Sequence, residues 1–210
     1  MEVINEISKA LQLGDLNTVQ EKIKDGLKNG INAETLLNDG LLSGMNIIGE
    51  KFKRNEVFVP EVLIAARAMN GGMEILKPKL VEAGVQSLGK VVIGTVKGDL
   101  HDIGKNLVKM MMEGAGFEVV DLGTDVSAED FVKAVDEYKP DILGLSALLT
   151  TTMPQMKETI EVLKESGLRD EVFVMVGGAP VTDNYAEEIG ADAYSKDAAT
   201  AASDAKKVVL

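Results

Sequence analysis

The sequence predicts an α/β protein in two parts. A four-helix bundle is expected over residues 1–85. A flavodoxin-like (Rossmann-like), doubly wound sheet of five parallel strands is expected over residues 91–210, after a linker at 86–90. Apolar residues repeat with helical spacing through the first part, whereas short β-branched runs alternate with helical stretches in the second. The runs at 90–96, 140–146 and 172–176 are almost continuously apolar, as expected for strands covered on both faces.

Capping residues mark the ends of the four expected helices. Gly14 ends the first helix, and Asp15 is the expected N-cap of the second, which closes at residues 29–30. Asn32 is the expected N-cap of the third helix, and Pro60 suits the first turn of the fourth. Short connections between amphipathic helices predict an antiparallel bundle.

Five strands and five further helices fill residues 91–210. The expected strands are 90–96, 117–122, 140–146, 172–177 and 192–195, and the expected helices are 104–115, 127–138, 153–166, 182–190 and 197–207. Ligands of doubly wound sheets bind at the carboxyl ends of the strands, where the strand order reverses. The loops after strands one, three and four, at 98–104, 146–152 and 177–180, are therefore the candidate site.

Composition excludes several classes of site. The chain has 22 basic and 34 acidic side chains, a net charge of -12, so nucleic-acid binding is not expected. Cysteine is absent and histidine occurs once, which excludes thiolate and multi-histidine metal sites. No apolar run has the length of a membrane helix and the first residues lack a signal peptide, so we expect a cytoplasmic protein. A metal bound here through imidazole must take its other ligands from carboxylates, water or a macrocycle.

The single histidine, His101, lies in the loop after the first expected strand, within the run Gly-Asp-Leu-His-Asp-Ile-Gly at 98–104. A neutral imidazole binds a metal through one nitrogen when a carboxylate orients the other. Asp99, two residues earlier, is placed to be that carboxylate. Taken alone, the pattern also fits an ordinary surface histidine in a polar loop.

The other two loops offer hydroxyl groups and glycines. Four hydroxyl side chains lie within 146–152, which N-capping of the next helix would also explain. Gly177 and Gly178 follow the fourth strand, where paired glycines either form a turn or let a ligand approach the backbone.

Several other site types fit these loops less well. Residues 97–104 lack a dinucleotide-binding fingerprint and the Gly-Lys-Ser/Thr ending of a phosphate loop. A serine hydrolase is disfavoured because no Gly-x-Ser-x-Gly is present. A phosphoacceptor role for Asp99, of the receiver type, ranks lower because no acidic pair opens the domain.

Taken together, Asp99-x-His101-x-x-Gly104, Ser146-x-Leu148 and the glycine pair at 177–178 resemble the cobalamin-binding signature. This signature is that of corrinoid proteins of methyltransferase systems and of the cobalamin domain of methionine synthase. Residues 44–52 (GMNIIGEKF) and 58–62 (FVPEV) resemble the helical cap of the same family. The resemblance therefore covers essentially the whole chain.

The resemblance implies a bound corrinoid, cobalamin or a relative, in the base-off/His-on form. His101 is then the cobalt ligand through Nε2, and Asp99 accepts the hydrogen bond from Nδ1. Thr152 stands where methionine synthase has a serine that completes this relay, and Gly104 is expected to permit a close turn. The other expected contact residues are Asp102, Ile103 and Thr150, with Ser146, Leu148, Gly177 and Gly178 lining the slot for the displaced nucleotide tail and Phe52, Val59 and Val62 covering the upper face of the corrin.

The implied function is to carry a methyl group on cobalt, as one component of a methyltransferase system rather than as a complete enzyme. The implied partners are a substrate-specific methyltransferase, a second methyltransferase that serves tetrahydrofolate, a pterin or a thiol, and a reductive activating protein. The alternatives are the cobalamin-binding subunit of an adenosylcobalamin mutase, a non-catalytic cobalamin-binding sensor and a cofactor-free interaction protein. The helical part at 1–85 argues against the mutase, and no output segment remains for a sensor.

Overall fold

The computed structural model describes residues 2–210, and the chain divides into two compact units. The first unit runs to Ser87 and the second begins at Leu88, with the short turn Gly114–Gly116 grouped with the first. Within residues 2–210 no helix has both the length and the apolar character needed to cross a membrane.

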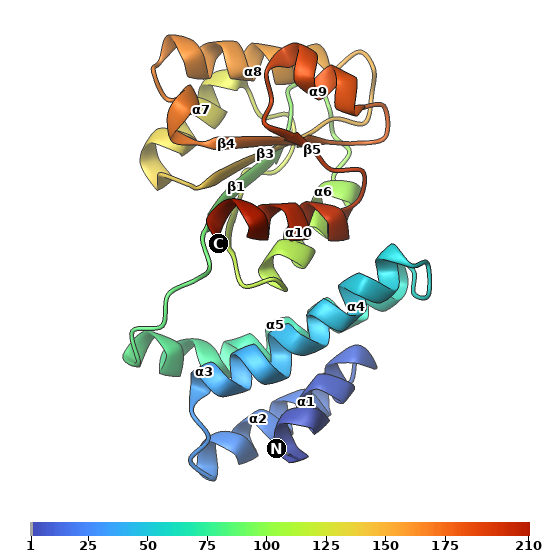
Figure 1. The fold of residues 1–210 in the computed structure, drawn as a ribbon, viewed down its shortest axis with the longest axis vertical. Helices are drawn as coiled ribbons and strands as arrows, with labels where there is room; N and C mark the ends of the chain where they lie inside the picture. The colour runs from blue at the N-terminus through green and yellow to red at the C-terminus, as the bar shows by residue number, and fades with distance from the viewer. Residues whose placement is uncertain (1) are drawn as a thin grey trace. The chain divides into compact units, whose positions relative to one another are not determined.

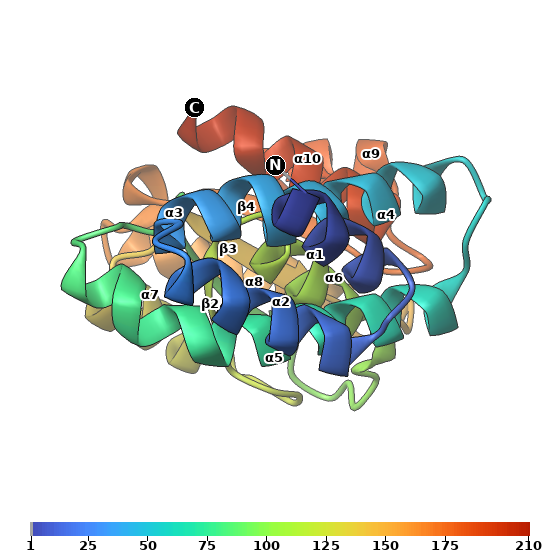
Figure 2. The same ribbon diagram turned by 90° about the horizontal axis from the view of Figure 1, so that it is seen from below.

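The first unit consists of four helices. They are α1 (Glu2–Gln12), α2 (Leu16–Lys28), a third helix composed of α3 (Ala33–Thr35), the π-helical segment η1 (Leu36–Leu42) and α4 (Ser43–Lys53), and the long α5 (Val59–Glu82). Both α2 and α4 pack against α1 and against α5 (Figure 2). The helices α1 and α5 also contact each other, so the four helices pack together as in the predicted bundle.

The predicted capping residues act where the sequence places them. Asp15 and Asn32 accept hydrogen bonds through their side chains from the backbone N–H groups of Thr18 and Thr35, at 3.1 and 2.8 Å. Gly14 adopts a φ of +69°, which ends α1. Pro60 lies in the first turn of α5, where its missing N–H costs no hydrogen bond.

The third helix differs from the regular helix that the sequence predicts, because η1 is π-helical. Two of its glycines lie where it packs on α1. A Cβ at Gly40 would stand 3.1 Å from Ile7 Cγ2, and a Cβ at Gly44 would stand 3.1 Å from the Ser8 carbonyl oxygen. Apolar periodicity reports which face is buried but not the hydrogen-bond spacing within a turn, so it does not distinguish π from α geometry.

The second unit is a five-stranded sheet in the order β2-β1-β3-β4-β5, with every neighbouring pair parallel. The strands are β1 (Lys90–Thr95), β2 (Glu118–Asp121), β3 (Ile142–Ser146), β4 (Phe173–Gly177) and β5 (Ala193–Tyr194). This is the predicted doubly wound topology. The strand order reverses between β1 and β3, so the loops after these two strands leave the sheet side by side.

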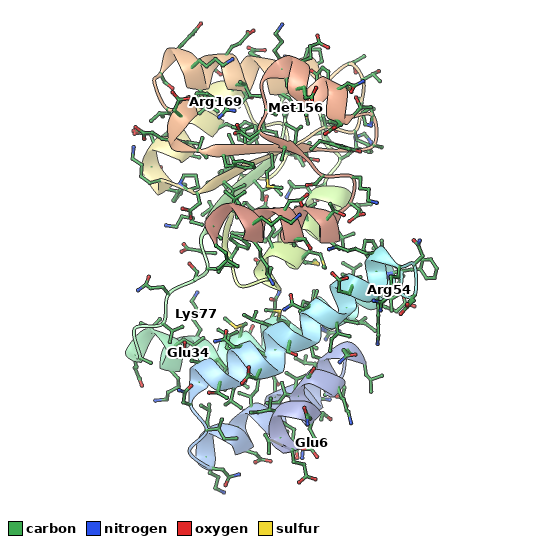
Figure 3. The ribbon with its side chains drawn as sticks, viewed as in Figure 1. Glu6, Glu34, Arg54, Lys77, Met156 and Arg169 are labelled. Atoms are coloured by element: carbon green, nitrogen blue, oxygen red, sulfur yellow. The ribbon has the colours of Figure 1, made fainter. Side chains whose placement is uncertain are left out.

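Helices cover both faces of the sheet (Figure 1). One layer holds α7 (Ala128–Tyr138), α8 (Pro154–Glu165) and α9 (Asp183–Ile189), and the other holds α6 (Ile103–Glu113) and α10 (Ala198–Val209). A short 3-10 turn, η2 (Arg169–Glu171), precedes β4. Met156 of α8 is fully buried in the core of this unit together with Leu143 and Val174, and lies between its helix and the sheet (Figure 3). The layered core fixes the strand ends from which the candidate loops emerge.

Candidate functional site

Asp99 is the centre of the site. It lies in the loop after β1 and its side chain is fully buried. The ring Nδ1 of His101 lies 2.7 Å from Asp99 Oδ1, which also accepts from the His101 backbone N–H at 3.1 Å. The loop after β3 supplies donors to the second oxygen: Oδ2 accepts from Leu148 N at 2.8 Å, from Leu149 N at 3.3 Å and from Thr152 Oγ1 at 2.8 Å. One carboxylate therefore joins the two loops that flank the switch point.

These donors decide the charge of the carboxylate. Burial by itself raises the pKa of Asp99, because it removes water from the charged form. The hydrogen bonds from the Leu148 and His101 amides, the His101 ring and the Thr152 hydroxyl outweigh this effect and hold the pKa of Asp99 well below its usual range. Asp99 is therefore ionised at neutral pH and acts only as an acceptor.

The acceptor character of Asp99 fixes the tautomer of His101. In the neutral imidazole, Nδ1 carries the proton that is directed to the carboxylate, and Nε2 then has the lone pair. The His101 side chain is 51% exposed, and within residues 2–210 Nε2 has no hydrogen-bond partner. The backbone carbonyl of His101 accepts from the buried Thr95 hydroxyl at 3.0 Å, which holds the residue to the end of β1. The result is an oriented imidazole whose Nε2 lone pair is available to bind a metal.

Thr152 completes the polar cluster from the turn that precedes α8. Its hydroxyl lies 2.8 Å from Asp99 Oδ2 and 2.9 Å from the Leu149 carbonyl oxygen. Its methyl group faces Gly98, where a Cβ would stand 3.6 Å from Thr152 Cγ2. The threonine thus keeps the predicted hydroxyl contact, and its extra methyl fills the space above a glycine.

A glycine pair ends β4 and starts the loop after it, and the second glycine packs closely on the loop after β3. Gly177 pairs with Ser146 at the ends of β4 and β3. Gly178 has a φ of +130°, and a Cβ there would stand 1.8 Å from the carbonyl oxygen of Ala147. No side chain fits at that position. The predicted convergence of the three loops on one edge of the sheet is confirmed by these contacts.

Gly104 differs from the expectation. It was expected to permit a close turn, but it lies in the first turn of α6 without a positive φ, because Asn106 N donates to the Asp102 carbonyl at 2.7 Å and starts the helix there. A Cβ at Gly104 would meet no atom within 4 Å. The protein's own packing therefore leaves open space beside this glycine.

Apolar side chains from the same loops are exposed around His101. Leu100 and Ile103 flank it in the chain and are 73% and 77% exposed. Leu148 and Leu149, whose amides bind Asp99, expose about two fifths of their surface. These four side chains make an exposed apolar surface on the segments that hold the half-exposed imidazole, a feature that is common at interaction sites.

The remaining predicted contact residues lie in both units of the chain. Asp102 and Thr150 are exposed, and the Asp102 carboxylate accepts from Asn106 Nδ2 at 3.1 Å. In the helical unit, Phe52 and Val59 are half-buried and Val62 is fully buried. A contact between these three and a ligand stays a prediction.

Sequence reasoning missed two sets of residues. The Leu148 and Leu149 amides are backbone donors, and no side-chain pattern reports them. Asp125 accepts a hydrogen bond from Gly98 N of the site loop, and the ion pair Lys105–Asp121 joins the start of α6 to the end of β2. The position of Asp125 just after the second strand, at the same edge of the sheet, was the available signal.

The protein alone offers no complete metal site. Across residues 2–210 there is no group of three or more His, Cys, Asp or Glu side chains that could hold a metal ion. A metal that meets Nε2 of His101 would take its other ligands from single carboxylates, from water or from a group that it brings along.

Two family comparisons cover the two units separately. Residues 89–205 match a family described as B12 binding domain, and residues 3–77 match a second family of the same description. Among individual proteins, trimethylamine corrinoid protein 1 of Methanosarcina acetivorans is 44% identical over 211 residues, covering 100% of this chain and 98% of that protein. Dimethylamine corrinoid protein 1 of the same organism is 46% identical over 183 residues, covering 87% and 86%.

Solved structures give the same result. The methanol:cobalamin methyltransferase complex of Methanosarcina barkeri contains a chain with a TM-score of 0.89 and 33% identity, and the match covers 99% of this chain and 80% of that one. A cobalamin-binding protein of Desulfitobacterium hafniense has a TM-score of 0.82 and 35% identity, with 99% and 98% covered.

Proposed function

This chain belongs to the B12-binding corrinoid protein family, and from that premise we propose that it carries a methyl group on a corrinoid bound base-off/His-on. The observation that carries the proposal is the single imidazole, oriented by a buried carboxylate and open at Nε2. When bound, the corrinoid supplies a cobalt ion that accepts a methyl group and gives it up again.

The residues present fit such a group. A corrin ring brings four nitrogen ligands, so one protein donor is sufficient, and one histidine is what the chain offers. The exposed leucines and Ile103 beside His101 suit the apolar faces of a macrocycle. The open space at Gly104 and the glycine-lined edge at Gly177 leave room for the nucleotide tail, together with Ser146 at the end of β3.

Each residue of the polar cluster has a distinct part in this proposal. His101 would hold the cobalt through Nε2. Asp99 holds the proton on Nδ1 and raises the electron donation of the ring, as carboxylates do for metal-bound histidines. Thr152 stabilises the ionised carboxylate through its hydroxyl, at 2.8 Å.

The helical unit has a separate proposed part. We assign residues 1–85 as a cap that shields the bound corrinoid and moves aside for each partner, with 86–90 as the linker. Such gating steps are common where a reactive group must be exposed only at the moment of transfer.

Three partners follow from the proposed reaction. A substrate-specific methyltransferase supplies the methyl group, a second methyltransferase removes it, and a reductive activating protein restores the cobalt after oxidation. The relatives named above are corrinoid proteins for trimethylamine and dimethylamine, and the solved complex concerns methanol. The full-length match to such proteins favours this function over a mutase subunit or a sensor.

The lone histidine makes the ligand assignment directly testable. Growth with [15N]histidine labels one side chain, His101. After loading with hydroxocobalamin and reduction to the paramagnetic cobalt(II) form, electron paramagnetic resonance should show ligand splitting from one axial nitrogen. The splitting should change from three lines to two when 14N is replaced by 15N. A spectrum that is unaffected by the label would remove His101 as the ligand.

Methyl transfer itself is tested with purified partner methyltransferases and trimethylamine, dimethylamine, monomethylamine and methanol as donors. Loss of the corrinoid's unmethylated absorbance with one donor identifies the class. His101→Ala should retain the circular dichroism of the folded protein but transfer poorly. Absence of transfer from every donor, in protein that holds corrinoid, would contradict the carrier function.

A further inference from the structure

One acidic side chain outside the predicted site holds the Asp99 loop from its other side. Asp125 follows β2, and its Oδ1 accepts a hydrogen bond from Gly98 N at 2.7 Å. Its own backbone N–H donates to the Asp99 carbonyl at 3.0 Å. The two hydrogen bonds close a ring between the loop after β2 and the loop after β1.

We propose that Asp125 is a positioning residue for the Asp99–His101 pair. Asp99 is held on two sides. Its carboxylate is fixed by the loop after β3, and its main chain is fixed by Asp125. The direction in which the carboxylate projects depends on both attachments, so the orientation of the His101 ring depends on Asp125 as well.

Asp125 is itself fixed to the sheet. Thr95 N donates to the Gly123 carbonyl at 2.9 Å, and Val126 N donates to the Thr95 carbonyl at 3.0 Å, so the chain on both sides of Asp125 is tied to the end of β1. The same Thr95 donates through its hydroxyl to the His101 carbonyl. The end of β1 is therefore hydrogen-bonded both to the loop that carries Asp125 and to His101.

The backbone conformation separates this role from that of an ordinary turn residue. Asp125 has a φ of +56°, one of three positive values among the non-glycine residues in 2–210, with Asn55 and Lys139. Such a conformation costs an L-residue about 1–2 kcal/mol, and glycine adopts it without strain. If the turn alone mattered, glycine would serve at least as well as aspartate.

The test compares three variants of the full chain. Asp125→Gly keeps the turn and removes the acceptor. Asp125→Asn keeps an acceptor oxygen for Gly98 N and tolerates positive φ. Lys139→Gly is the control, because it also replaces a residue of positive φ by glycine, but at the end of α7, before β3 begins and thus at the opposite edge of the sheet.

The first measurement needs no corrinoid. Nitrogen NMR of [15N]histidine-labelled protein reports which ring nitrogen of His101 carries the proton. Wild type, Asp125→Asn and Lys139→Gly should show the Nδ1–H form, whereas Asp125→Gly should show a mixture with the Nε2–H form. A folded Asp125→Gly with the wild-type signals would overturn the inference, and so would Asp125→Asn with the mixed signals.

The second measurement rests on the proposed function. Titration with hydroxocobalamin, followed by absorbance, should show about tenfold weaker binding for Asp125→Gly, within the range for residues that support a metal ligand. Lys139→Gly should bind as wild type does. If even His101→Ala binds with an unchanged spectrum, the proposed ligand fails, while the NMR measurement still judges Asp125 independently.

Discussion

Lys105 and Asp121 form an ion pair inside the α/β unit, with Lys105 Nζ 2.6 Å from Asp121 Oδ1 and the lysine side chain 2% exposed. Lys105 also donates to Asn106 Oδ1 at 2.8 Å, and Asp121 accepts from Gly123 N at 3.0 Å. The pair fastens the start of α6 to the end of β2. Both elements adjoin the site, since α6 begins two residues after His101.

Removing one member of this pair should destabilise the fold. Asp121→Ala leaves the Lys105 ammonium buried without its main counter-charge, and we expect a loss of about 3 kcal/mol in the free energy of unfolding. Denaturant titration measures it. Asp136→Ala, which breaks the exposed ion pair with Lys139, is the control and should cost less than about 1 kcal/mol. Equal losses for the two variants would contradict the prediction.

Asp99→Asn should weaken corrinoid binding while keeping the shape of the side chain. The asparagine NH2 must face the Leu148 amide or the His101 ring, which are both donors, so one hydrogen bond is replaced by an opposition of donors. We expect a loss of about 1–3 kcal/mol in stability and 10–100-fold in hydroxocobalamin affinity. Isothermal titration and denaturant unfolding give the two values. Unchanged affinity would show that the carboxylate does not support the ligand.

Gly104→Ala should raise the stability of the fold and weaken corrinoid binding. The new methyl meets no protein atom within 4 Å and replaces a glycine inside α6, so stability should rise by up to about 1 kcal/mol. Corrinoid binding should nevertheless weaken, because the methyl occupies space proposed for the cofactor. A variant that is more stable and binds fully would remove Gly104 from the binding surface.

Gly178→Ala should strongly destabilise the fold. Its Cβ would stand 1.8 Å from the Ala147 carbonyl oxygen at a φ of +130°, so the loop that carries Leu148 must move. Gly167→Ala is the control, because Gly167 has a φ of +76° but an open surrounding, and should cost about 1 kcal/mol. We expect Gly178→Ala to cost at least twice as much and to reduce corrinoid binding, as measured by unfolding and absorbance titration.

The stability of the fold should depend on pH through Glu113. Burial raises the pKa of Glu113, Asp121 acts in the same direction and Lys109 opposes it. A raised carboxyl pKa means that the folded state binds the proton more tightly, so stability is lost as the pH rises through the folded pKa. Glu113→Gln should therefore be more stable than wild type at pH 7, and the gain should vanish near pH 4, close to the ordinary pKa of about 4.3. A gain that is constant with pH would contradict the assignment.

Most of the fold was predictable because its signals are local. The capping roles of Asp15 and Asn32 depend on neighbours three residues away, and each apolar strand reports its own burial. The parallel order then follows from the alternation of strands and helices. The π-helical segment Leu36–Leu42 was not predictable, because the apolar pattern reports which face is buried and not the hydrogen-bond spacing.

The contacts of the candidate site likewise divide into local ones, which the sequence predicts, and distant ones, which it does not. Asp99 and His101 lie two residues apart, and their contact could be inferred from spacing. The donors to Asp99 from Leu148 and Leu149 are main-chain groups about fifty positions away, and any residue type supplies them. Asp125 is distant in the same sense, since its partner Gly98 has no side chain to mark the contact.

The Thr152 hydroxyl carries one proton between two oxygens at nearly equal distance, Asp99 Oδ2 at 2.8 Å and the Leu149 carbonyl at 2.9 Å. Rotation about the Cβ–Oγ1 bond redirects that proton from one to the other. If the carboxylate gains a proton of its own, the hydroxyl swings to the carbonyl and becomes the acceptor. One hydroxyl group thus has two alternative acceptors within hydrogen-bond distance, one on each side of the contact between the two loops.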